Sequence, residues 1–153
     1  MSEGPQPSDV VPVAPAEPWV SEPAYREGAA DLLGILAYGA LAAFDRLAED
    51  ARRAPTVADK VYMASLAALQ IKHFETVRAR LSELDVDVMV AMKPFHAPFD
   101  QFHAQTKPKD WLEGLVLAYV GNGFAADFYR EVAAFVDTDT RALVHQVLAD
   151  EGH

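Results

Sequence analysis

The sequence lacks cysteine entirely, which excludes a disulfide framework, a thiolate metal site and a cysteine nucleophile. It also lacks a run of about 18 consecutive apolar residues and a signal-peptide pattern, so we predict no membrane span and no secretion. Cations are scarce, because 13 lysine and arginine residues stand against 23 aspartate and glutamate residues, for a net charge of −10. That charge disfavours nucleic acid and anionic membranes as partners. We expect a cytoplasmic protein.

The apolar content is sufficient for one folded domain. The chain has 153 residues, of which 51% are hydrophobic, enough for a single compact core. Prolines concentrate at the N-terminus, where they alternate with small and acidic residues: Pro5, Pro7, Pro12, Pro15, Pro18 and Pro23. Such a composition sustains neither a helix nor a core. We therefore predict a disordered Pro-rich tail over residues 1–21 and a folded domain over residues 22–153.

Apolar residues recur at helical spacing in most of the remaining chain, and no alternating strand pattern is visible. The spacing predicts three long helices, over about 24–53, 57–84 and 109–136. Charged residues of the first, Asp50 among them, lie mostly outside its apolar stripe. Thr56 and Asp59 form a capping box at the start of the second. In the third, Gly121 and Gly123 indicate a kink, a bulge or a close approach of another helix.

Two further segments complete the predicted helices. Residues 85–108 are interrupted by prolines and predict two short helices, over 87–92 and 98–105. Asp137 to Thr140 supply a turn and an N-cap for a fourth helix that continues to residue 153. The short links predict antiparallel neighbours, and the long link between the second and third long helices allows these two to run parallel. The fold class is therefore all-α, an antiparallel four-helix bundle with the single long crossover of the ferritin-like type.

The fourth helix is only about half as long as its neighbours. Half of the apolar seam on the other helices would therefore face water. Either the natural chain continues beyond residue 153, or another subunit covers the seam. The second alternative predicts a homo-oligomer formed through the exposed seam.

A di-iron site in such a bundle has a known ligand pattern. Two helices each contribute one carboxylate, and the other two each contribute an acid-x-x-His pair, because divalent iron prefers anionic oxygen and imidazole ligands. The second helix offers Gln70 and His73, with an amide in place of the acid, and the fourth offers Asp150 and His153. These two pairs are the first candidate metal ligands.

The other two long helices offer less. The periodicity places Ala40 of the first helix at the depth of a ligand, and the third helix presents Asn122, with Asp127 and Glu131 on the adjoining stripe. Asp127 and Glu131 are either substitute ligands or structural partners of a neighbouring arginine. His73 is likewise either a ligand or a core histidine bonded to Gln70.

Four strings resemble the actinobacterial ferritin-like proteins related to the tRNA hydroxylase MiaE. They are residues 37–51 (AYGALAAFDRLAEDA), 73–75 (HFE), 119–131 (YVGNGFAADFYRE) and 148–153 (LADEGH). The resemblance covers residues 28–153. It implies a di-iron, oxygen-using hydroxylase fold, with a modified adenosine of tRNA as substrate in the best-known members. It also implies acids at the positions of Ala40, Gln70 and Asn122, so three anionic ligands are absent together.

The missing carboxylates decide between two functional hypotheses. Two ferrous ions bring a charge of about +4, which Asp150 alone does not neutralise. We therefore expect a degenerate metal site, no cofactor, and a non-catalytic binding or structural module. The alternative is a metal-dependent hydroxylase with a di-iron or mono-iron site, acting on a modified tRNA adenosine or similar substrate. Its irregular site would be built from His73, Asp127, Glu131, Asp150 and His153.

Overall fold

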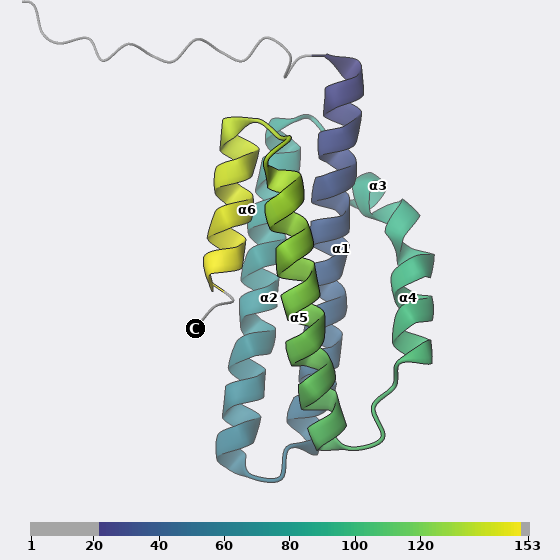
Figure 1. The fold of residues 1–153 in the computed structure, drawn as a ribbon, viewed down its shortest axis with the longest axis vertical. Coiled ribbons are helices and arrows are strands. Elements are labelled where there is room, and N and C mark those ends of the chain that lie inside the picture. The colour runs from purple at the N-terminus through teal and green to yellow at the C-terminus, as the bar shows by residue number, and fades with distance from the viewer. Residues whose placement is uncertain (1–21, 151–153) are drawn as a thin grey trace, which may run out of the picture.

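The computed structural model describes residues 22–150, so the predictions for the 1–21 tail and for His153 lie outside the described residues. The described chain consists of helices joined by short non-helical links and contains no strand, which confirms the all-α prediction. Its elements are α1 (Pro23–Arg53), α2 (Val57–Glu83), α3 (Val88–Met92), the 3₁₀ turn η2 (Lys93–Phe95), α4 (His96–Gln105), α5 (Trp111–Ala133) and α6 (Thr138–Asp150). In Figure 1, α1, α2, α5 and α6 lie side by side, and α3 and α4 lie on the outer side of α1.

Side-chain caps determine where three of the helices begin. The Asp59 backbone amide donates to Thr56 Oγ1 at 3.1 Å, which confirms the predicted start of α2. The Glu113 amide donates to Asp110 Oδ1 at 2.8 Å, so α5 begins at Trp111, two residues later than predicted. The Thr140 amide donates to the carboxylate of Asp137 at 3.1 Å and thereby caps α6 as predicted.

The segment between α2 and α5 differs slightly from the prediction. The first short helix has nearly the expected bounds, and the second begins at His96 instead of Pro98. Pro98 is tolerated there because the backbone amides of a first helical turn have no acceptor within the helix. Gly34 of α1 allows α3 to lie close, since a Cβ at residue 34 would collide with the backbone carbonyl of Ala91.

The core lies mainly along α1. Its most extensive interface is with α2. Fully buried apolar side chains from α1, α2 and α6 meet there, among them Leu33, Val77, Leu81 and Val144. By length and composition alone α1 is the one described helix apolar enough to cross a membrane, with 44% of its most apolar window buried, and a helix in a protein core passes the same test.

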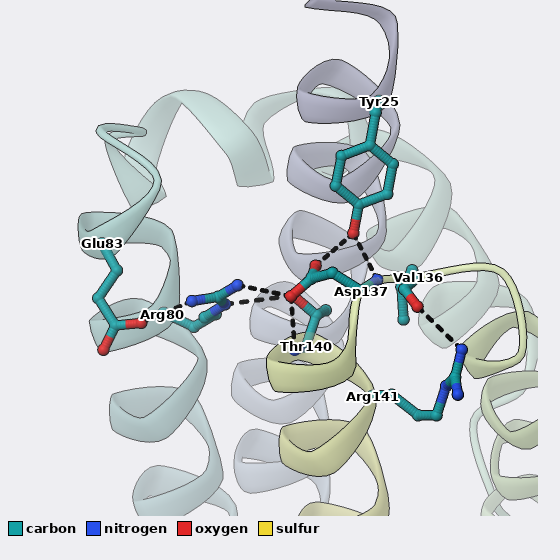
Figure 2. A network of polar contacts seen from close by, with 7 residues as sticks. All are labelled: Tyr25, Arg80, Glu83, Val136, Asp137, Thr140 and Arg141. Carbon is teal, nitrogen blue, oxygen red and sulfur yellow. Dashed lines mark hydrogen bonds and ion pairs between the residues drawn. The ribbon is translucent and has the colours of Figure 1, made fainter. Parts of the chain in front are cut away.

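A buried polar network joins three helices at one end of the molecule (Figure 2). Asp137, 4% exposed, accepts hydrogen bonds from the Tyr25 hydroxyl and from Thr140 Oγ1, and pairs with the Arg80 guanidinium at 2.8 Å. Burial alone would raise the pKa of Asp137, but the hydrogen bonds from Thr140 and Tyr25 and the charge of Arg80 lower it below its usual value of 3.8. This network ties the starts of α1 and α6 to the end of α2.

Helix α5 is largely exposed, although its sequence is apolar. Only Gly114 and Ala133 are buried in it, and Tyr119 and Phe124 are 83% and 75% exposed. Residues 111–133 form one continuous helix, and a Cβ at Gly121 or Gly123 would meet nothing within 4 Å. No close helix approach therefore occurs at these glycines within the described chain. The predicted inward side of α5 is largely an open face, because no described helix covers it.

Candidate functional site

An apolar groove of about 930 Å³ lies between α2 and α5. In Figure 1, α1, α2 and α5 run along most of the molecule, whereas the described part of α6 lies beside only the upper half of α2. Leu148, near the end of α6, lines the groove, and Leu47 and Met63 contribute from the core side. The groove thus lies beside the last described turn of α6.

The two helical walls of the groove carry almost no charge. Residues 61–71 of α2 and 115–126 of α5 contain no aspartate, glutamate, lysine or arginine. Large apolar side chains line the walls: Tyr62, Leu66, Leu69, Leu115, Val116, Tyr119, Val120 and Phe124. The charged residues in the lining are Asp127 and Arg130, which pair with each other at 3.0 Å. An uncharged groove of this kind suits an apolar helix better than a phosphate or a polar metabolite.

A histidine and a carboxylate meet near the end of α6. His73 Nε2 lies 3.5 Å from Asp150 Oδ2, and Lys72 Nζ lies 3.8 Å from the same oxygen. His73 is 2% exposed, and its burial lowers the pKa of the imidazole below 6.5 despite the nearby carboxylate. Gln70, one turn away on α2, is also buried and lines the groove. His73 and Asp150, two of the predicted ligand residues, therefore lie close together.

The remaining predicted ligand positions are divided between the core and the surface. Ala40 of α1 is buried. Asn122, Asp127 and Glu131 of α5 are exposed, and Asp127 pairs with Arg130, the structural alternative considered for it. His153 lies outside the described residues. Of the predicted ligands, the structure brings together only His73 and Asp150 within residues 22–150.

This arrangement does not fit a pair of iron ions. Nowhere between residues 22 and 150 do three histidine, aspartate or glutamate side chains gather as a metal site would require. Two ferrous ions would need several anionic oxygen ligands, and the core positions hold Ala40 and Gln70 instead. We derive no chemistry that runs through iron.

Comparison with known families identifies the fold. The family model described as "Ferritin-like domain, actinomycetes" matches residues 23–153. The chain belongs to this ferritin-like family. No curated protein matches it. The match includes every helix of the described structure, so the groove and the His73 to Asp150 contact both lie within the ferritin-like domain.

The ferritin-like domain also buries a carboxylate that sequence periodicity misplaced. Asp50 was predicted outside the apolar stripe of α1, but it is 1% exposed, and its Oδ2 atom has no hydrogen-bond partner among the described residues. Burial raises the pKa of Asp50 above 3.8, although Arg46 and Arg53 oppose the shift. No local pattern signals this burial, because it depends on Gly114 of α5, whose missing side chain leaves room for the carboxylate.

Proposed function

We propose that this ferritin-like domain is a non-catalytic binding module whose α2–α5 groove receives an apolar helix. The observation that carries the proposal is the open, almost uncharged groove of about 930 Å³ between α2 and α5. Removing such a surface from water lowers the free energy by roughly 25 cal/mol per Å² of apolar area. The groove is therefore suited to bind an apolar helix. The acidic, cysteine-free composition supports a cytoplasmic location.

The proposal also accounts for the residues at the predicted ligand positions. We infer a four-helix bundle of the ferritin type, related to the di-iron tRNA hydroxylases, in which Ala40, Gln70 and Asn122 stand where carboxylates would be ligands. Removing carboxylates from an empty site relieves their mutual repulsion and favours a neutral core. The burial of Ala40 and Gln70 supports this account.

Metal analysis of the full chain tests the proposal. Protein purified without chelator should contain iron far below stoichiometry, and added Fe(II) should leave the thermal midpoint unchanged. About two irons per chain would contradict the proposal, because a non-catalytic module needs no di-iron centre. The matched variant combines Ala40→Glu, Gln70→Glu and Asn122→Glu. If the positions are correctly assigned, it should gain metal-dependent stabilisation.

A single-metal enzyme is the second candidate, because His73 and Asp150 already lie 3.5 Å apart. With His153 they would form a two-histidine, one-carboxylate set that suits one Fe(II) or Zn(II) ion. We expect His73→Ala to abolish any saturable binding of either metal, with His145→Ala as the exposed control. Binding that is identical in both variants would rule this candidate out.

A further inference from the structure

The exposed apolar surface extends beyond the groove itself. Leu112 and Phe128 of α5 are 64% and 51% exposed but do not line the groove. A helix that filled only the groove would leave these two side chains in water. The occupant must therefore cover both the groove and the adjoining row of exposed apolar side chains on α5, called the ridge below.

The size of this surface matches a stable interface. Applying their exposed fractions to the surface of an aromatic side chain, Tyr62, Tyr119 and Phe124 leave roughly 400 Å² in water. The aliphatic neighbours Leu112, Val116 and Val120 are each about half exposed or more and add roughly 300 Å². The total approaches the roughly 800 Å² per partner that standard stable interfaces bury.

The best-matched helix in the described chain is α5 itself. Its exposed apolar residues recur at four-residue spacing from Leu112 through Val116, Val120 and Phe124 to Phe128, a row that extends about 24 Å along the helix at 1.5 Å per residue and winds gradually around it. The α5 wall of the groove runs from Leu115 to Arg130, nearly the same length. Ridge and groove therefore match in length as well as in chemistry.

The distribution of charge also favours α5 of a second copy as the occupant. Two copies of a chain with net charge −10 repel each other over most approaches. The repulsion is least where the copies meet through residues 61–71 and 115–126, which are uncharged. A basic protein or a nucleic acid would instead select a charged surface, and this one has none beyond the internally paired Asp127 and Arg130.

From these observations we propose that a second copy of this chain occupies the groove. The two copies are related by a two-fold axis near the middle of α5, so that each α5 ridge lies in the groove of the other copy. A two-fold interface buries the same patch on both subunits, which removes ridge and groove from water in one step. This inference rests on the proposed function, because it names the helix that the groove receives.

Sedimentation of the full chain over a range of concentrations tests the inference. We expect a dimer whose dissociation constant falls as salt is added, because salt screens the repulsion between the acidic copies. Phe124→Asp should raise that constant at least about tenfold, since a central aromatic anchor is lost. Phe135→Asp is the matched control, because Phe135 is 81% exposed but does not line the groove. Circular dichroism should show that both variants remain helical.

The absence of cysteine allows a second, independent measurement. Val120→Cys, near the middle of α5, should give a disulfide-linked dimer under mild oxidation, and Met89→Cys on the exposed surface of α3 should not. A monomer at all concentrations, or a dimer that Phe124→Asp leaves intact, would overturn the inference. Binding of the monomer to phosphatidylcholine vesicles would overturn it too and identify a membrane as the occupant. None of these results involves iron, so they are distinct from failure of the proposed function, which two irons per chain would reveal.

Discussion

The Asp50 carboxylate lies directly against the backbone of Gly114. A Cβ atom at residue 114 would be 2.9 Å from Asp50 Oδ1 and 3.3 Å from its carboxyl carbon. The two residues come from α1 and α5, and this contact is one of the few places where α5 is anchored to the core. A glycine on one helix thus makes room for a buried acid on another.

Gly114→Ala should therefore destabilise the fold. The added methyl group forces a buried carboxylate to move, at a cost of about 1–3 kcal/mol, which outweighs the gain of about 1 kcal/mol in helix propensity. Urea unfolding measures the net effect. Gly121→Ala is the control on the same helix, and since a Cβ there meets nothing within 4 Å it should stabilise by about 1 kcal/mol. Equal effects of the two substitutions would contradict the contact.

Asp50→Asn should change how stability depends on pH. Because the folded-state pKa of Asp50 is raised, the folded chain holds this proton more tightly than the unfolded chain does. The contribution of Asp50 to stability is thus present at low pH and is lost as the pH rises above 3.8 toward the folded-state pKa. Urea unfolding from pH 4 to pH 8 should show that the free energy of unfolding of Asp50→Asn rises relative to that of the wild type as the pH increases. Asp45→Asn, an exposed carboxylate on the same helix, should not reproduce that trend.

Asp137→Ala should be among the most destabilising single substitutions. It leaves the Arg80 guanidinium, 12% exposed, without its buried partner and removes the cap of α6, at a cost of about 3–5 kcal/mol. The wild-type contribution of Asp137 is present above pH 3.8 and is lost as the pH falls through its lowered folded-state pKa. Thermal unfolding at pH 7 and at pH 3 should therefore show a smaller penalty for the variant at the lower pH. Asp139→Ala, an exposed neighbour, is the control.

Tyr25→Phe tests the other side of this network. Burial, followed by the hydrogen bond to Asp137, raises the pKa of Tyr25 to about 12. The hydroxyl's contribution to stability, about 1–2 kcal/mol, is therefore full below pH 10 and declines between pH 10 and about 12. An ultraviolet titration should show one fewer late-ionising tyrosine in the variant. Tyr38, whose pKa the hydrogen bond to Asp100 raises to about 12, should still ionise late in the variant. An unchanged number of late-ionising tyrosines would contradict the prediction for Tyr25.

His73→Gln should reduce the loss of folding stability that the wild type shows at acidic pH. Burial lowers the folded-state pKa of His73, so the unfolded chain takes up a proton more readily. The wild type should consequently lose stability as the pH falls below 6.5, and His73→Gln should lose less over the same interval. His145→Gln, an exposed histidine of α6, should follow the wild type. Urea unfolding between pH 5 and pH 7.5 measures the difference.

Much of the fold was readable from local patterns. Apolar periodicity predicted the long helices, and Thr56, Asp59 and Asp137 marked two helix starts that the structure confirms. These features depend on residues within a few positions of one another, where hydrogen-bond geometry and helical spacing leave few alternatives. Family membership was also foreseeable from sequence strings, and the family match is to a ferritin-like domain.

The tertiary structure alone decided the features that depend on distant residues. Periodicity placed Asp50 outside because it describes one helix at a time, whereas burial of that acid depends on the absent side chain of Gly114, far along the chain. Likewise the short fourth helix predicted that part of an apolar seam would face water, but only the tertiary structure shows that this seam lies on α5, where Tyr119 and Phe124 are exposed. A sequence specifies which faces are apolar, but burial requires a second surface, and only the packed arrangement of helices determines whether that surface is there.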